Sequence, residues 1–162
     1  MTQFSIISRN KNLKSYLNYL LLLFFISFSF GFKSDKGSVN WTSFTAGYAQ
    51  AKKENKILIV DMYTDWCGWC KRMDKDTYEK KDVYNLINAK FVAVKFNPEK
   101  GETHSYNGKQ LSGSELKDAI TQNQFEGYPA TIFINPNKNN EVRVVTGYHK
   151  PNEFIELLNT IK

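Results

Sequence analysis

Apolar runs alternate with amphipathic segments over most of the chain, from about residue 41 to residue 162. Three continuous apolar runs predict buried strands, at Ile57–Tyr63, Phe91–Phe96 and Ala130–Ile134. A fourth strand, Glu141–Thr146, follows the third through an asparagine-rich turn and is expected to pair with it as an antiparallel hairpin. Because helix and strand signals alternate, the sequence predicts one α/β domain.

Amphipathic segments lie between these strands and predict helices with one apolar face. The predicted helices cover Ser43–Lys56, Cys67–Lys80, Val83–Asn88, Ser114–Asn123 with Ser114 as its N-cap, and a final segment that begins at Pro151. The segment Glu99–Gly113 is different, because it is polar, carries three glycines and shows no periodicity. It predicts an exposed loop.

The N-terminal region has a pattern of its own. Three basic residues before position 15 precede the apolar run Tyr16–Phe32, which is typical of a secretion signal. The run is nearly long enough to span a bilayer, so an uncleaved membrane anchor is the alternative. In both cases the basic residues keep the N-terminus cytoplasmic, and the rest of the chain is expected outside the cytoplasm, periplasmic or otherwise extracytoplasmic, either secreted or anchored to the inner membrane. We therefore divide the chain into residues 1–36, a signal peptide or anchor plus linker, and one domain at 37–162.

Charge does not suggest a nucleic-acid partner. The formal net charge is +6, but five of the 22 basic residues lie in the first 36 positions, with one acidic residue among them. In the rest of the chain, lysines alternate with aspartates and glutamates and form no basic stripe. We expect no nucleic-acid binding.

Both cysteines lie in the segment 66–71, WCGWCK, directly after the first predicted strand. Two thiols three residues apart in the first turn of a helix lie on one face, close enough to form a disulfide without backbone movement. Cys67 is at the helix N-terminus, where free N–H groups and the helix dipole favour the thiolate, so it is the expected nucleophile. Cys70, one turn further in and expected to be more buried, fits the resolving thiol.

Two other interpretations of this pair are weaker. A C-x-x-C pair can supply half of a zinc site, whose other ligands would be His104 and His149, but these histidines are not spaced as a ligand pair. A chaperone or adaptor with a purely structural disulfide is the other alternative. A bridge that encloses two residues constrains the unfolded chain little, which makes such a role poorly supported. We expect a redox-active pair and neither metal nor other cofactor.

The segment Ile59–Lys71 resembles the active-site strand and helix of the thioredoxin family. Asp61 stands six residues before the first cysteine and Trp66 immediately before it. The sequence GYPAT at 127–131 resembles the cis-proline loop of the family, and Lys95 falls where the family often has a lysine that faces the buried aspartate. The resemblance covers about residues 41–162. It implies the thioredoxin fold, a central mixed sheet with helices on both faces.

The resemblance also implies catalytic roles. In a buried strand, desolvation raises the pKa of Asp61 toward neutrality, and the carboxyl group then relays a proton to or from Cys70. Lys95 either pairs with Asp61 and tunes this transfer or extends its ammonium group to water.

A substrate-binding surface is implied as well. A cis Pro129 would place the backbone of Tyr128 next to the sulfur atoms, where it offers hydrogen bonds to an extended substrate peptide. Trp66 and Trp69 are expected to form an apolar platform for that peptide, with Trp69 the more exposed of the two.

The Gly-Trp pair between the cysteines is similar to that of secreted bacterial thioredoxin-like proteins and of the C-terminal domain of transmembrane disulfide reductases. This implies an extracytoplasmic thiol–disulfide oxidoreductase that reduces disulfides in proteins and receives electrons from a membrane thiol donor. We expect a monomer. The long connection between Phe96 and Pro129, which contains His104 and Tyr106, is expected to cover one side of the active site.

Overall fold

The computed structural model describes residues 37–162, so the predicted signal or anchor lies outside the described residues. A five-stranded mixed sheet forms the centre of this part, in the order β1-β3-β2-β6-β7. The strands are β1 (Trp41–Thr42), β2 (Ile57–Met62), β3 (Phe91–Phe96), β6 (Ala130–Asn135) and β7 (Glu141–Thr146). β3 runs parallel to β1 and β2, whereas β6 is antiparallel to β2 and β7 is antiparallel to β6. The four predicted strands are confirmed.

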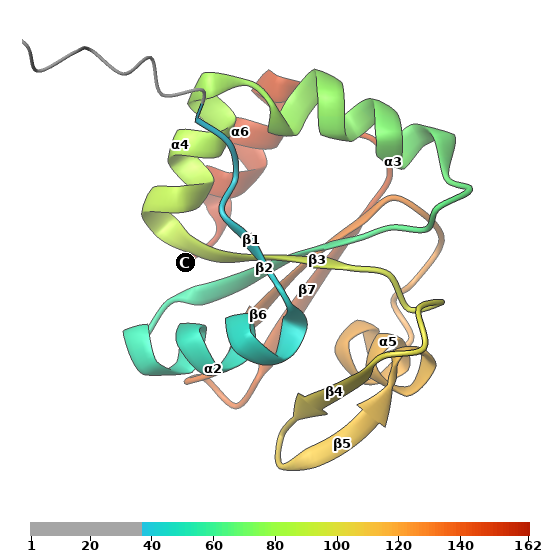
Figure 1. Ribbon diagram of the computed structural model, residues 1–162. Coiled ribbons are helices and arrows are strands. Elements are labelled where there is room, and N and C mark those ends of the chain that lie inside the picture. The colour runs from blue at the N-terminus through green and yellow to red at the C-terminus, as the bar shows by residue number, and fades with distance from the viewer. Residues whose placement is uncertain (1–36) are drawn as a thin grey trace, which may run out of the picture. The chain divides into compact units, whose positions relative to one another are not determined.

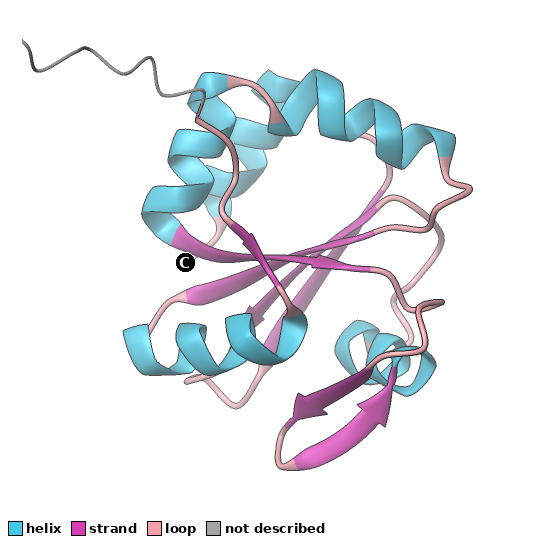
Figure 2. Ribbon diagram, viewed as in Figure 1, coloured by secondary structure: helices cyan, strands magenta, loops and turns pink. Residues whose placement is uncertain are grey.

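Helices cover both faces of the sheet (Figures 1 and 2). They are α2 (Phe44–Glu54), α3 (Gly68–Met73), a π-helical turn (Asp74–Tyr78) that continues α3, α4 (Lys81–Lys90), α5 (Gly113–Thr121) and α6 (Pro151–Thr160). α3, α4 and α6 lie on one face, and α2 and α5 lie on the other (Figure 1). This is the predicted thioredoxin fold.

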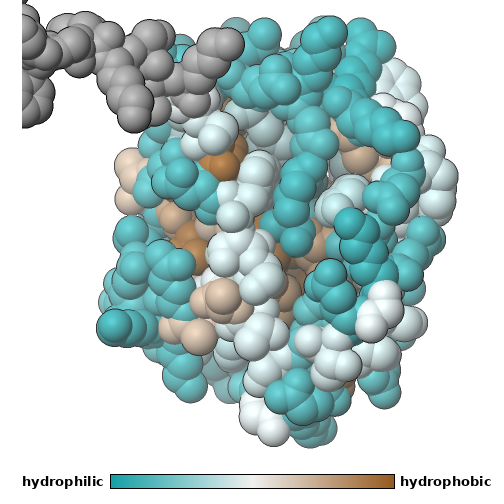
Figure 3. All heavy atoms as spheres, in the orientation of Figure 1, coloured by the Kyte–Doolittle hydropathy of each residue, from teal (hydrophilic) through white to brown (hydrophobic). Residues whose placement is uncertain are grey.

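Two clusters of buried side chains fill the two sides of the sheet. One cluster includes Phe44, Leu58, Val60, Val94, Phe96, Leu116 and Ile132. The other includes Ile59, Met73, Val83, Ile87, Phe133, Phe154 and Leu158. Successive residues of β2 alternate between the clusters because side chains along a strand point to opposite faces. On the face seen in Figure 3, hydrophilic residues cover most of the surface and hydrophobic ones show between them.

The prediction of an exposed loop at Glu99–Gly113 is wrong. This segment contains a second, two-stranded sheet, β4 (Thr103–Tyr106) paired with β5 (Lys109–Ser112). The turn between them is Asn107-Gly108, whose φ angles of 54° and 77° match the left-handed turn that favours this dipeptide in hairpins. The glycines made the segment look irregular, although Asn-Gly is a strong hairpin signal.

Two side chains of this hairpin enter the core. His104 and Tyr106 alternate with exposed residues and are only 5% and 7% exposed. Both rings pack edge-on against Phe44, on the α2 side of the sheet. The hairpin therefore extends the core on the α2 side of the sheet, and the expected cover of one side of the active site is left to other parts of the connection, where Glu99 and Tyr128 contact Trp66.

The start of α5 also differs from the prediction. Its N-cap is Ser112 and not Ser114. The Ser112 hydroxyl accepts a hydrogen bond from the Glu115 backbone N–H, and the Glu115 carboxylate accepts one from the Ser112 N–H. This reciprocal capping box outweighs Ser114, which has no such glutamate three residues later.

Gly113 is expected to be sensitive to substitution because α5 begins against the backbone of Pro98. A Cβ atom at Gly113 would overlap the Pro98 carbonyl oxygen. Gly113→Ala should therefore lower the free energy of unfolding by about 1–3 kcal/mol, as overpacking does elsewhere. Urea denaturation measures the change. Gly101→Ala, where a Cβ atom meets nothing within 4 Å, is the control. Equal stability of the two variants would contradict the argument.

Within residues 37–162, no helix combines the length and the apolar character needed to cross a membrane.

Candidate active site

The two cysteines form a disulfide at the N-terminal end of α3. The S–S distance is 2.09 Å and the Cα atoms are 5.4 Å apart. Cys67 is the N-cap residue, and its Sγ accepts a hydrogen bond from the Cys70 backbone N–H at 3.1 Å. Both side chains are buried, at 5% and 3% exposure, so the expected difference in burial between them is small. The Cys67 sulfur thus lies where helix N–H groups favour negative charge.

Asp61 lies near the end of β2, beneath this helix. It alternates with Val60 and so faces the same side of the sheet as Ile59, the side of α3. It is 2% exposed, and burial raises the pKa of its carboxyl group from 3.8 to about 6, although Lys95 acts in the opposite direction. A buried carboxyl group with this pKa gains and loses a proton near neutral pH.

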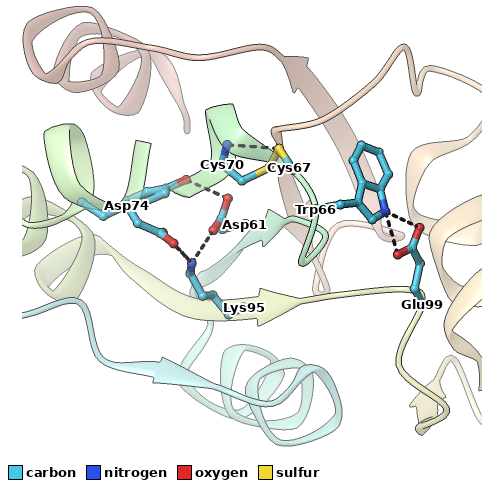
Figure 4. Close-up of a disulfide and its surroundings, with 8 residues drawn as sticks. Asp61, Trp66, Cys67, Cys70, Asp74, Lys95 and Glu99 are labelled. Carbon is cyan, nitrogen blue, oxygen red and sulfur yellow. Dashed lines mark hydrogen bonds and ion pairs between the residues drawn. A yellow bond between two sulfur atoms is a disulfide. The ribbon is translucent and has the colours of Figure 1, made fainter. Parts of the chain in front are cut away.

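Lys95 lies beside Asp61 because the two residues are register partners in the parallel pair β2–β3. Its Nζ is 3.3 Å from Asp61 Oδ2 and donates hydrogen bonds of 2.5 and 2.6 Å to the two oxygens of Asp74 (Figure 4). Burial acts to lower the pKa of Lys95, but the two carboxylates outweigh it and raise the pKa. Of the two alternatives left open for Lys95, the structure therefore shows the ion pair.

Asp74, which is partly exposed, and the buried Tyr78 complete this polar cluster, and neither was predicted from the sequence. They come from the π-helical turn that continues α3. The Tyr78 hydroxyl donates a hydrogen bond to Asp61 Oδ1 at 3.3 Å and lies 3.5 Å from the Thr131 hydroxyl. Asp74 follows Cys70 by four residues, the spacing at which helical side chains share a face, so it could have been found from the sequence.

The two exposed tryptophans flank the disulfide, but in the opposite order of exposure from that expected. Trp66 is 67% exposed and Trp69 is 55% exposed. Trp69 is the more covered because its ring packs against Tyr148 at 5.5 Å and beneath the guanidinium of Arg72 at 5.4 Å. The indole N–H of Trp66 instead donates to both oxygens of Glu99, at 3.1 and 3.0 Å (Figure 4).

The loop before β6 lies next to Trp66. The Tyr128–Pro129 peptide bond is cis. The Tyr128 ring meets Trp66 edge-on at 5.7 Å and Phe125 at 4.9 Å. The structure thus brings together the cysteines, the two tryptophans and Tyr128 at one end of the sheet.

The histidines of the zinc hypothesis pack against phenylalanine side chains. His104 packs between Phe44 and Phe96, and His149 lies against Phe154. In the part of the chain that the structure describes, no group of three or more His, Cys, Asp or Glu side chains is arranged to hold a metal ion.

Comparison with known proteins finds a matching family model and solved structures with the same fold. A family model described as a thioredoxin-like domain matches residues 44–162. A solved structure from Bacteroides thetaiotaomicron, described as a proposed disulphide isomerase, is 31% identical and covers 76% of this chain and 89% of its own, with a TM-score of 0.55. The oxidoreductase DsbH shares the fold with a TM-score of 0.58 at 15% identity, covering 76% of this chain and 84% of its own.

One curated relative is the thiol:disulfide interchange protein DsbD of Vibrio cholerae, which is 35% identical over 49 residues, 30% of this chain and 8% of that protein. The chain spans only 6–13% of the length of the first curated relatives that it matches.

Proposed function

The chain belongs to the thioredoxin-like family, and from this premise we propose that it is an extracytoplasmic thiol–disulfide oxidoreductase that reduces disulfides in other proteins. The fold and the close cysteine pair fit a thiol–disulfide oxidoreductase. The observation that supports the proposal most strongly is the juxtaposition, drawn in Figure 4, of a Cys67–Cys70 disulfide at a helix N-terminus with the buried Asp61, whose pKa of about 6 suits proton transfer.

In the proposed reaction the reduced pair supplies two electrons to the substrate. The Cys67 thiolate attacks one sulfur of a substrate disulfide, which forms a mixed disulfide and releases one substrate thiolate. The Asp61 carboxylate then accepts the proton of the Cys70 thiol. The Cys70 thiolate attacks the Cys67 sulfur, the Cys67–Cys70 bond closes, and the second substrate thiolate leaves. Both released thiolates take up protons, one of them supplied by Asp61.

Neighbouring residues have supporting roles in this proposal. Lys95 stabilises the charged form of Asp61 and so sets the pH at which it accepts a proton. The backbone of Tyr128, before the cis Pro129, would bind the substrate segment as an added strand, with Trp66 and Trp69 in contact with its side chains.

The direction of electron flow and the partner are also proposals. No histidine lies between the cysteines to stabilise the Cys67 thiolate, which favours a reducing pair over a strongly oxidising one. Such a reductase outside the cytoplasm needs an electron source, and we infer a membrane thiol donor. Residues 1–36 would direct the domain there, either as a cleaved signal or as an anchor, and the domain would act as a monomer.

The reduction potential of the cysteine pair tests this direction. The protein is equilibrated with defined ratios of reduced and oxidised dithiothreitol or glutathione, and the free thiols are counted by alkylation and mass spectrometry. A potential near about −270 mV would support a reductase, and one near about −120 mV would mean a disulfide-forming oxidant.

Asp74 is expected to keep the pKa of Asp61 high. Its charge raises that pKa directly, and it also shares the Lys95 ammonium group. In Asp74→Asn, Lys95 should interact with Asp61 alone, and the titration midpoint of Asp61 should fall below about 6. NMR of the Asp61 carboxyl carbon against pH measures this midpoint. Asp76→Asn removes a nearby acid that pairs with Arg72 instead, and it should leave the midpoint in place.

A further inference from the structure

The surroundings of the two exposed tryptophans differ in charge. Trp66 and Trp69 are the two exposed large hydrophobic side chains among residues 37–162. Trp69 carries a cation, the Arg72 guanidinium, over its ring. Trp66 has an anion at its edge, because both Glu99 oxygens accept its indole N–H. The two ends of the surface around the disulfide therefore favour different side chains in a partner.

The Glu99 carboxylate has no cationic partner in the described part of the chain. No lysine, arginine or histidine nitrogen lies within 4.0 Å of its oxygens. The adjacent Lys100 is directed elsewhere, since its Nζ donates to the Tyr63 hydroxyl at 3.4 Å. A single indole N–H also leaves acceptor capacity on both Glu99 oxygens. Glu99 is thus an exposed charge, still able to accept hydrogen bonds, next to an exposed aromatic ring.

Such a pair suits the side chain of lysine or arginine. The aliphatic stem and the cationic head both interact favourably with an indole face, and the head can reach a carboxylate at the edge of the ring. The ring of Tyr128 stands edge-on to Trp66 at 5.7 Å and closes one side of the site. The negative charge of Glu99 acts on Tyr128 as well, where it adds to the effect of burial in raising the pKa of that phenol.

We propose that Glu99 and Trp66 form a specificity site for a lysine or arginine that lies next to the reactive disulfide of a partner protein. This inference rests on the proposed function, because it names the substrate class of the same surface. A partner with an acidic residue at that position would place two carboxylates side by side, and it would be disfavoured.

Three cyclic peptides test the proposal. Each is closed by one disulfide, and they are identical except for a lysine, glutamine or glutamate next to the first cysteine. The full chain, reduced beforehand, should reduce the lysine peptide about five- to tenfold faster than the glutamate peptide at low salt, measured as the second-order rate constant. The difference should shrink as salt screens the charges.

Matched variants test whether the preference for the lysine peptide comes from Glu99. Glu99→Gln should bring the rates for the three peptides together, and Glu99→Asp should retain part of the preference. Glu102→Gln, an exposed acid in the same connection, should behave as the unmodified chain. Equal rates for the lysine and glutamate peptides with the unmodified chain, or an unchanged preference in Glu99→Gln, would overturn the proposal.

A binding measurement separates this inference from the redox function. Linear peptides with serine in place of each cysteine cannot react, and their binding is followed by the NMR signal of the Trp66 indole N–H. If no cyclic peptide is reduced but the lysine peptide shifts this signal and Glu99→Gln abolishes the shift, then the proposed function fails and the specificity site stands. If the signal does not distinguish lysine from glutamate, the specificity site is refuted.

Discussion

Cys67→Ser should reduce the turnover of a protein disulfide such as insulin to the rate seen with dithiothreitol alone. A serine hydroxyl is not ionised near neutral pH and cannot form the mixed disulfide, so the first step is lost. The fold should survive, because the substitution is nearly isosteric. With the unmodified chain also held reduced, the two free energies of unfolding should agree within about 0.5 kcal/mol.

Cys70→Ser is the matched variant, since it removes the resolving thiol and keeps the nucleophile. It should accumulate a covalent mixed disulfide with the substrate through Cys67, visible by mass spectrometry and cleaved by dithiothreitol. If Cys67→Ser retained turnover, or if the mixed disulfide formed in Cys67→Ser and not in Cys70→Ser, the assignment of the nucleophile would be reversed.

Asp61→Asn should slow disulfide exchange at neutral pH and leave it unchanged at high pH. Near pH 7 the Cys70 thiol depends on a base, and loss of that base is expected to slow resolution by about 100-fold. Above about pH 9 a thiol with an ordinary pKa ionises without help, and the two rates should converge. The measurement is the pH profile of turnover. Parallel profiles across this range would contradict the proton relay.

The same substitution should stabilise the fold, and the sign follows from the pKa. The folded-state pKa of about 6 lies above the ordinary value of 3.8, so the folded chain binds the Asp61 proton more tightly than the unfolded chain. Burial of the charge therefore destabilises the fold progressively as pH rises from about 3.8 through about 6.

At about 1.36 kcal/mol per pKa unit, this destabilisation approaches about 3 kcal/mol above neutral pH. Asp61→Asn should recover most of it at pH 8 and little of it at pH 4. Denaturant unfolding at the two pH values measures the difference, with Asp76→Asn, which removes a partly exposed acid paired with Arg72, as the control. A gain in stability of equal size at both pH values would show that the effect does not come from the Asp61 charge.

The parts of the fold that were predicted correctly are those with a clear local pattern in a short stretch of sequence. The buried strands at Ile57–Met62 and Phe91–Phe96 are runs of apolar residues, and the cysteine motif fixed the start of α3. The hairpin at Thr103–Ser112 was missed because the two side chains that it buries are His104 and Tyr106, and neither residue type is as strong a sign of burial as valine or isoleucine.

The interactions within the candidate site also differ in whether they could be predicted from the sequence. Lys95 could be placed near Asp61 from the motif, and the strand register confirms their proximity. The interaction of Lys95 with Asp74 could not be placed, because it depends on how the π-helical turn sits over the sheet. The relative exposure of Trp66 and Trp69 depends on Tyr148 and Arg72, and the packing of Tyr148 onto Trp69 joins residues 79 positions apart in the chain.

The placement of the tryptophans gives the chain built-in optical probes. The sequence has three tryptophans, and each lies beside the disulfide or beside the polar cluster of Asp61, Lys95 and Tyr78. Trp66 and Trp69 adjoin the disulfide, whereas Trp41 packs edge-on against Tyr78 at 5.1 Å and lies 5.7 Å beneath the Lys95 ammonium group. A disulfide quenches nearby excited indoles, so emission from Trp66 and Trp69 should rise on reduction. Emission from Trp41 should follow the ionisation of Asp61. In a chain with Trp66 and Trp69 both changed to phenylalanine, the remaining tryptophan emission would then follow the protonation of Asp61 and would not respond to the redox state of the cysteine pair.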